Sequence, residues 1–195
     1  MTLTLEHKKY IGGIAFLVVF LLLVRSLILR VKREQFVRAC ERSFGSLDEA
    51  QKDSIRLIVK TFEKYGDKDQ NKLIYILATT EHECSFQSKK EYRTYSDRQE
   101  KYWHTGYYGR GFVQLTHDRN YEKMSKLLGV DFLSNPDLVM KPQYAARILV
   151  QGMMEGSFTR KPLEKYINAS KVDFYNARRV VNGTDRASRI EGYAK

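Results

Sequence analysis

An uncharged apolar run lies near the N-terminus of this chain and limits the folds that are open to it. Residues 10–24 read Y-I-G-G-I-A-F-L-V-V-F-L-L-L-V. If Arg25 extends its side chain toward the polar surface of a bilayer, the apolar stretch continues to residue 29. As a helix, residues 10–29 would span about 30 Å, the thickness of the hydrocarbon core of a bilayer. The run therefore predicts one N-terminal transmembrane helix and a lipid bilayer as a partner.

A cleaved signal peptide is the competing interpretation of the same run. No pair of small residues that would mark a cleavage site follows it, because residues 25–30 read R-S-L-I-L-R. An uncleaved anchor is therefore favoured. Basic residues are more frequent after the run than before it, and the positive-inside tendency favours a cytoplasmic location for the rest of the chain.

The remaining composition predicts one mainly helical domain. Residues 1–34 are assigned to a tail, the anchor and a basic linker, and residues 35–195 to the domain. Hydrophobic residues make up 43% of the chain, which suffices for one core. Ser46 and Glu49 have the spacing of a capping box. Apolar residues recur at helical spacing, bounded by glycine or proline, in the segments 36–44, 46–65, 73–83, 121–128, 142–149, 162–167, 172–181 and 186–194.

Two glutamates eight positions apart, Glu83 and Glu91, are the main candidates for chemistry. Glu83 closes the apolar segment 73–83, so we expect it at the mouth of a buried helix, where lost solvation raises a carboxyl pKa from about 4.3 toward about 6. Glu91 lies in the cationic stretch 89–93, which favours the ionised form. A protonated carboxyl and an ionised one are the acid and the base that cleavage of a glycosidic bond requires.

A zinc site is the alternative for this segment, because His82 and Glu83 begin like H-E-x-x-H. The second histidine would fall at Phe86, so the motif is incomplete, and no metal or other cofactor is predicted. The connector 85–106 is too polar for a core and predicts a small hairpin or an irregular lobe. The glycines within 106–111 allow close approach of the backbone, but no G-K-[ST] follows them, so a nucleotide site is not favoured.

These residues resemble glycoside hydrolase family 19, the group of chitinase-like enzymes and phage endolysins. The resemblance covers about residues 73–195, and Y-Y-G-R-G-F-V-Q-L-T at 107–116 is its most specific part. It implies a lysozyme-like, two-lobed helical domain with a small irregular or β lobe. The remaining motifs follow in the family order: His82-Glu83, Glu91, Asn120-Tyr121, V-V-N-G at 180–183 and an arginine-bearing helix at 186–189.

The resemblance also implies roles for particular side chains. Glu83 is expected to be the general acid, Glu91 the general base, and Thr116 the hydroxyl that positions the water. Glu100 remains the alternative base. The implied mechanism inverts the anomeric carbon, with the two carboxyls about 6.5 to 9.5 Å apart. The side chains expected to bind sugar are Tyr108, Arg110, Gln114, Asn120, Tyr121, Asn182 and Arg189.

The expected function is that of a membrane-anchored hydrolase of bacterial peptidoglycan. The protein is expected to cross a membrane once. That membrane is either a host inner membrane, with the domain in the periplasm despite the positive-inside tendency, or a virion membrane. A lytic transglycosylase, which works with a single glutamate and releases an anhydro sugar, would fit the same motifs. So would a chitinase, or a non-catalytic virion membrane protein that binds wall glycan or nucleic acid.

The net charge of +11 calls for an anionic partner, which could be nucleic acid, a membrane surface or the cell-wall polymer. Basic and aromatic residues alternate in segment 93–103, as they do in proteins that bind single-stranded nucleic acid. Rings that stack on sugars in a cleft explain the same pattern, and the carboxylate pair favours that explanation. Nucleic acid is therefore not expected as a partner.

The chain has two cysteines, Cys40 and Cys84. Their simplest interpretation is two small buried hydrophobic residues. The alternative is a bond between them that tethers Glu83 in an inactive geometry.

Overall fold

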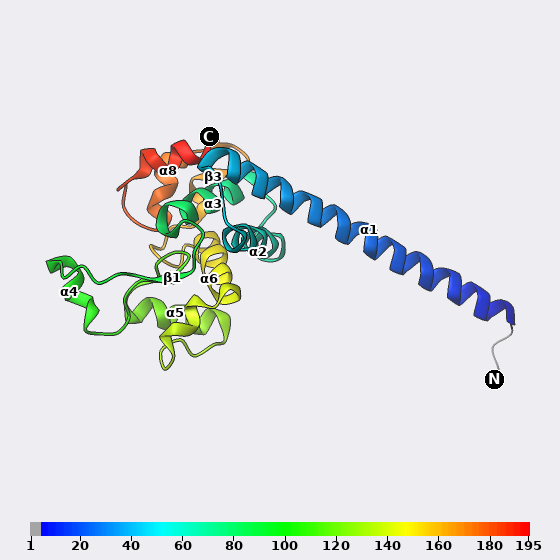
Figure 1. Cartoon of the computed structure of the whole chain (residues 1–195), viewed down its shortest axis with the longest axis horizontal. Coiled ribbons are helices and arrows are strands. Elements are labelled where there is room, and N and C mark those ends of the chain that lie inside the picture. Colours follow the sequence, from blue (N-terminus) through cyan, green and yellow to red (C-terminus); the bar gives the residue numbers. More distant parts are fainter. Residues whose placement is uncertain (1–4) are drawn as a thin grey trace.

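The computed structural model describes residues 5–195, with side chains from residue 17 onward. The described part is mainly helical, as predicted, and contains two short antiparallel hairpins (Figure 1). The α-helices are α1 (Leu5–Phe44), α2 (Glu49–Tyr65), α3 (Gln70–Cys84), α4 (Asp97–Trp103), α5 (Asp118–Leu128), α6 (Pro142–Glu155), α7 (Phe174–Ala177) and α8 (Ala187–Ala194). The 3-10 helices are η1 (Pro136–Met140), η2 (Leu163–Lys165) and η3 (Arg178–Val180), and the strands are β1 (Lys89–Lys90), β2 (Arg110–Gly111), β3 (Ile167–Asn168) and β4 (Lys171–Val172).

Helix α1 runs without interruption from the apolar run into the body of the protein. The sequence predicted a separate short helix at 36–44, but residues 25–44 contain neither glycine nor proline. Good helix formers fill this stretch, so the helix continues until Gly45, which has a φ of 91°. The predicted domain boundary at residues 34 and 35 therefore lies inside α1. The N-terminal part of this helix extends away from the body (Figure 1).

The predicted transmembrane segment 10–29 begins among residues whose side chains lie outside the described part. From Leu17 to Val24, all eight consecutive side chains are exposed, with exposed fractions between 38% and 64%. Successive residues of a helix point about 100° apart, so this exposure surrounds the helix. Within the described residues, no helix has an apolar stretch long enough to cross a membrane.

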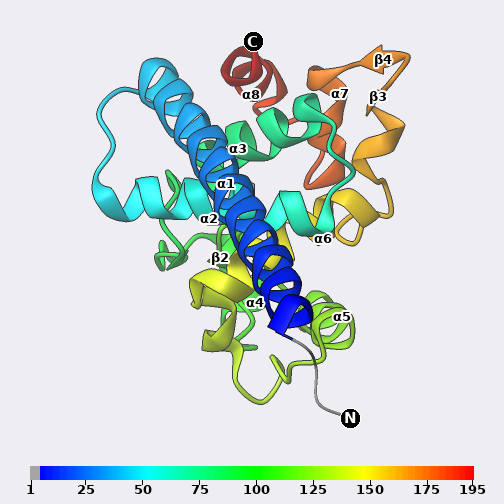
Figure 2. The same cartoon turned by 90° about the vertical axis from the view of Figure 1, so that its right-hand side faces the viewer.

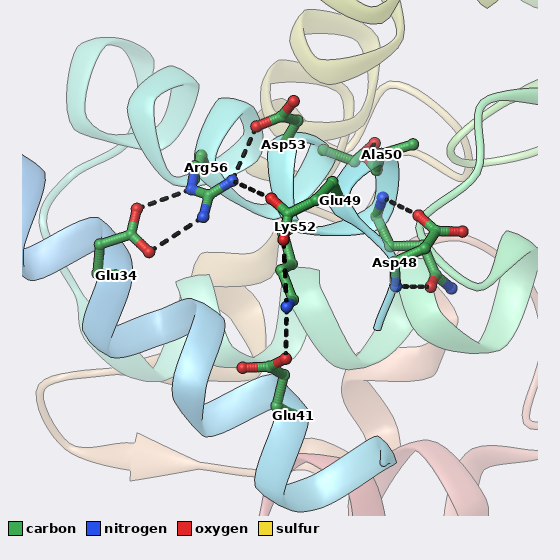
Figure 3. A network of polar contacts seen from close by, with 10 residues as sticks. Glu34, Glu41, Asp48, Glu49, Ala50, Lys52, Asp53 and Arg56 are labelled. Atoms are coloured by element: carbon green, nitrogen blue, oxygen red, sulfur yellow. Dashed lines mark hydrogen bonds and ion pairs between the residues drawn. The ribbon is translucent and has the colours of Figure 1, made fainter. Parts of the chain in front are cut away.

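Ion pairs attach the C-terminal half of α1 to α2 (Figure 3). Arg56 donates to both carboxylate oxygens of Glu34, a bidentate geometry that fixes two helices more firmly than a single contact. Val37 and Cys40 are buried beneath these pairs. The pairs between the two helices are Arg33 with Glu63, Glu34 with Arg56, and Glu41 with Lys52, at 2.5, 2.7 and 2.9 Å.

The start of α2 differs from the prediction by two residues. The capping box is formed by Asp48 and Gln51 rather than by Ser46 and Glu49: Gln51 N donates to Asp48 Oδ1, and Asp48 N donates to Gln51 Oε1 (Figure 3). Leu47 explains the difference. It is buried, and as the residue before the cap it can enter the core without being part of the first turn.

The core surrounds α3, most of whose side chains are buried. Helices α2 and α8 pack against it, and α3 and α8 lie together at one end of the body (Figure 2). The prediction of a buried helix rested on apolar residues on two faces, and Ile76 and Leu77 on those faces are both buried. The last turn of α3, which carries Glu83, is half-buried at the edge of this core.

The connector after α3 forms a small lobe. Strand β1 pairs antiparallel with β2, with Lys89 opposite Gly111 and Lys90 opposite Arg110. Helix α4 lies in the loop between these strands and projects from the body on the side away from the free end of α1 (Figure 1). This pairing brings Glu91 beside Gly109, whose carbonyl accepts a hydrogen bond from the Glu91 amide at 2.8 Å.

Candidate active site

Glu83 lies in the last turn of α3 with its side chain 17% exposed. Its Oε1 accepts a hydrogen bond of 2.5 Å from Nη1 of Arg178, whose own side chain is 4% exposed. The prediction of an uncharged, apolar environment for this carboxyl is wrong, because η3 places a buried guanidinium against the end of α3. Among the described residues, no side chain or amide donates to Glu83 Oε2.

Glu91 follows β1, and three donors orient its carboxylate. Gln99 Nε2 and Tyr102 Oη donate to Oε1 at 2.9 and 2.6 Å, and Gly109 N donates to Oε2 at 2.9 Å. Burial, together with donation to Glu91, raises the pKa of Tyr102 to about 12, so its hydroxyl remains a donor throughout the neutral range. An ionised carboxylate has about four acceptor sites, so Glu91 retains capacity to accept from a water.

Two of the cations expected to surround Glu91 are engaged elsewhere. Lys90 pairs with Asp137 at 3.1 Å, and Arg93 pairs with Glu100 at 3.1 Å. The prediction of a cationic environment for Glu91 is therefore corrected: two neutral side chains and one backbone amide hold it. Glu100 is turned toward Arg93 and does not line the cleft described next, so the geometry favours Glu91 as the base.

Glu83 and Glu91 line one cleft with a volume of about 820 Å³. This volume lies within the range of ordinary ligand-binding sites. Helix α4 contributes one wall, and the segment after β2 contributes Val113 and Leu115. Of the predicted site residues, those that line the cleft are Glu83, Glu91, Gln114, Thr116, Asn120 and Asn182. Their individual roles stay predictions.

The turn after β2 fixes the polar groups at the base of the cleft. Gln114 has a positive φ of 51°, and its side-chain amide donates to the carbonyls of Lys89 and Gly111 at 3.1 and 3.0 Å. Thr116 Oγ1 donates to the Gln114 carbonyl at 2.9 Å. The Thr116 oxygen therefore keeps its lone pairs for a donor in the cleft, such as a water.

Arg110 and Tyr121 do not line the cleft, and their predicted contact with sugar is corrected. Their exposed fractions are 4% and 0%. Arg110 Nη1 donates to the carbonyls of Gly106 and Tyr108 and to Tyr121 Oη at 2.9, 3.2 and 3.0 Å, and Arg110 Nε donates to Asp137 at 2.8 Å. These contacts close the glycine-rich turn, so Arg110 has a structural role.

Tyr108 and Arg189 also lie outside the cleft lining. Tyr108 is stacked on Trp103 with ring centroids 4.2 Å apart, and the Arg110 guanidinium lies 3.9 Å from its ring centroid. Arg189 Nε donates to Tyr193 Oη on α8 at 2.8 Å. Contact of Tyr108 and Arg189 with sugar stays a prediction.

Three residues that contact the glutamates were missed from the sequence. Arg178 is 95 positions from Glu83, and no spacing rule connects such a pair. Its place between the buried residues Ala177 and Val180 was a usable signal, because a buried arginine needs a carboxylate or carbonyl partner. Gln99 and Tyr102 lie at i and i+3 on α4, a spacing that places both on one face of that helix.

The cysteines are separate free thiols in the structure, so the alternative of a bond between Cys40 and Cys84 is not realised. Both are buried, and burial raises the pKa of each thiol to about 12. Cys84 Sγ lies 3.4 Å from the carbonyls of Thr80 and Phe112, which is consistent with a small residue packed in the core.

Part of this chain is similar to known glycoside hydrolases. Residues 66–148 match the family model of glycoside hydrolase family 19, described as chitinase class I. Chitinase 11 of Oryza sativa subsp. japonica is 38% identical over 89 residues, which are 45% of this chain and 32% of that protein. The acidic endochitinase pcht28 of Solanum chilense is 57% identical over 35 residues, which are 17% of this chain and 14% of that protein.

The chain thus spans about a third or less of the length of these curated relatives. The crystal structure of a bacterial family 19 chitinase aligns over 80% of this chain and 89% of that chain, with 18% sequence identity and a TM-score of 0.43. The family model and the plant chitinases together support a glycoside hydrolase family 19 domain in this chain.

Proposed function

We propose that this chain hydrolyses β-1,4 glycosidic bonds of an amino-sugar polymer with inversion at the anomeric carbon. The observation that carries the proposal is that two glutamates with different partners, Glu83 and Glu91, line one cleft. An inverting hydrolase needs one carboxyl that protonates the leaving oxygen and a second that activates water on the opposite face of the sugar.

The contacts of each glutamate suit one of these roles. Arg178 holds Oε1 of Glu83, so Oε2 is the oxygen that can carry a proton to the bond being cleaved. The three donors around Glu91 fix the direction in which it accepts, which positions a general base relative to its water. Thr116 Oγ1, with free lone pairs, can accept the second hydrogen of that water.

Bacterial peptidoglycan is the substrate that we propose, and chitin is the alternative. Both contain β-1,4-linked amino sugars, so the acid and base do not discriminate between them. The matched plant proteins are named as a chitinase and an endochitinase. An apolar α1 that would tether the domain to a membrane favours a polymer lying next to a membrane, as peptidoglycan does.

The masses of the products test hydrolysis directly. The full chain is incubated with purified cell walls and, in parallel, with chitin oligomers, and the soluble fragments are measured by mass spectrometry. We expect fragments that have gained one water for each bond cut. Fragments lighter by one water, with anhydro ends, would establish a transglycosylase and overturn the proposal. Cleavage of chitin oligomers without release from walls would reassign the substrate to chitin.

We also propose that the apolar part of α1 inserts into a bilayer. The support is the exposure of all large apolar side chains from Leu17 to Val24 on a helix that has no partner there among the described residues. Apolar surface that surrounds a helix needs either a protein interior or lipid. The continuous helix and its ion pairs to α2 would then hold the cleft at a fixed distance from the membrane.

Charged substitutions in this segment are expected to abolish insertion. Each lysine at the centre of a membrane-spanning helix costs about 2.5 to 3.5 kcal/mol. Leu22→Lys combined with Leu23→Lys should therefore remove the full chain from the lipid fraction when it is floated with phosphatidylcholine/phosphatidylglycerol vesicles. Ser43→Lys combined with Ser46→Lys adds the same charge at exposed positions and should float like the native chain. Equal flotation of both variants would refute the anchor.

A further inference from the structure

Helix α4 separates its charges between the cleft and the outer surface. Arg98 and Lys101 line the cleft, whereas Asp97 and Glu100 do not. With about 100° between successive residues, Arg98, Lys101 and Tyr102 fall within an arc of about 100°, and Glu100 lies on the opposite side of the helix. The wall of the cleft that α4 provides is therefore cationic.

Two contacts hold this wall against the candidate base. Gln99 and Tyr102 of α4 both donate to Glu91 Oε1, at 2.9 and 2.6 Å, and Gln99 is only 3% exposed. Arg98 precedes Gln99, and Lys101 precedes Tyr102. The two cations thus lie within one helical turn of residues that touch Glu91, and they line the same cleft as this candidate base.

Neither cation is neutralised by a carboxylate of the described part of the chain. The ion pairs found there include Arg93 with Glu100 in the same lobe, but none with Arg98 or Lys101. The acidic side chains lining the cleft are Glu83 and Glu91, which are already bonded to Arg178 and to the donors around Glu91. Two cations beside a sugar-sized cleft can therefore pair with an anionic group of a ligand.

We propose that Arg98 and Lys101 form a subsite that binds a carboxylate of the substrate and so select an acidic amino-sugar polymer over a neutral one. This inference rests on the proposed function and deepens it. The carboxylates of such a polymer are the lactyl groups of N-acetylmuramic acid, where no peptide is attached, and the carboxylates of the peptide stems. Chitin has neither, so a chitin-specific cleft would have no use for this pair of cations.

The test compares two substrates that differ at the lactyl carboxyl, which is charged in one and neutral in the other. The first is a soluble glycan strand of alternating N-acetylglucosamine and N-acetylmuramic acid with its peptides removed, and the second is the same strand with its carboxyls converted to methyl amides. We expect kcat/KM of the full chain to be roughly fivefold higher on the carboxylate strand, the size that two partly exposed ion pairs can provide. High salt should reduce this ratio.

The double variant Arg98→Gln/Lys101→Gln should lose the preference through a higher KM on the carboxylate strand, so that its kcat/KM becomes equal on the two strands. Arg42→Gln/Lys64→Gln removes two exposed charges from α1 and α2, away from the cleft, and should keep the preference. Equal kcat/KM of the native chain on both strands, or a preference that survives in Arg98→Gln/Lys101→Gln, would overturn the subsite.

Two further measurements separate the possible outcomes. A strand with intact peptide stems, whose lactyl carboxyls are amides, shows whether peptide carboxylates are bound as well. If kcat/KM on this strand is lower for Arg98→Gln/Lys101→Gln than for the native chain, the subsite also binds peptide carboxylates. If the two values are equal, the subsite is restricted to the lactyl group. Titration calorimetry with the carboxylate and amidated strands measures the preference without catalysis. If no strand is cut but the carboxylate strand binds more tightly in a manner that requires both cations, the proposed hydrolysis fails while the subsite stands.

Discussion

Glu83→Gln is expected to lower kcat by about a thousandfold on any substrate that the native chain cleaves, because an amide cannot protonate the leaving oxygen. The fold should survive, since the glutamine carbonyl can still accept the hydrogen bond that Arg178 now donates to Oε1. The measurement is the initial rate of release of reducing ends, with the melting temperature recorded for each protein.

Glu81→Gln is the matched control for this experiment. It makes the same chemical change on the same helix, two residues earlier, and Glu81 does not line the cleft. Burial raises the pKa of Glu81, so its environment penalises the charged carboxylate and should accept a neutral glutamine. We expect near-native activity from Glu81→Gln. Retention of more than about a tenth of the activity by Glu83→Gln would remove Glu83 from the role of general acid.

Arg110→Met is expected to cause the largest loss of stability. The substitution leaves the carbonyls of Gly106 and Tyr108, the Tyr121 hydroxyl and Asp137 without their shared donor. Breaking a buried charged network by removing one partner costs about 3 to 5 kcal/mol, which is roughly 10 °C in Tm for a chain of this length. Thermal unfolding followed by circular dichroism measures the shift.

Arg119→Met on α5 supplies the comparison, because Arg119 is exposed and such substitutions usually change stability by less than about 0.5 kcal/mol. Arg110→Lys should fall between native and Arg110→Met, since lysine keeps the charge but cannot serve several acceptors with a planar fork. Activity should also decrease at temperatures where the variant is still folded, because the turn carries Gly109, a donor to Glu91. If Arg110→Met and Arg119→Met unfold at the same temperature, Arg110 does not stabilise the glycine-rich turn at 106–111.

Local patterns in the sequence predicted the parts of the fold that depend on neighbouring residues. The buried α3, the turn at Gly129 and the helix that begins at Pro142 all follow from apolar spacing and from residues that start or stop helices. The capping box was misplaced because Ser46 with Glu49 and Asp48 with Gln51 have the same spacing. Only the burial of Leu47 in the folded core decides between these two pairs.

The environments of the two glutamates could not be predicted in the same way. The apolar residues before Glu83 predicted lost solvation, but the structure adds an arginine from a segment 95 positions away. Lys90 and Arg93 are close to Glu91 in sequence, yet each pairs with another carboxylate once the chain folds. Sequence proximity thus indicated which residues share a cleft but not which charges act on them.

The resemblance to family 19 likewise did not predict which side chains of the glycine-rich turn face the cleft. Its motif identified the segment at 107–116 correctly, but a motif does not tell which of its side chains face a ligand. Gln114 and Thr116 line the cleft, whereas Arg110 supports the turn from the interior. A buried arginine within a motif has a structural role as readily as a catalytic one, and only the contacts of the folded chain separate the two.

In the proposed mechanism, Glu83 donates a proton while Glu91 activates a water on the opposite face of the sugar. The most direct measurement is a time course of proton NMR spectra during cleavage of a soluble β-1,4-linked amino-sugar oligomer. We expect the first product to carry the α-anomer, which then equilibrates with the β-anomer. A first product with the β configuration would mean attack by a group other than a water held by Glu91, and would contradict the assignment of both glutamates.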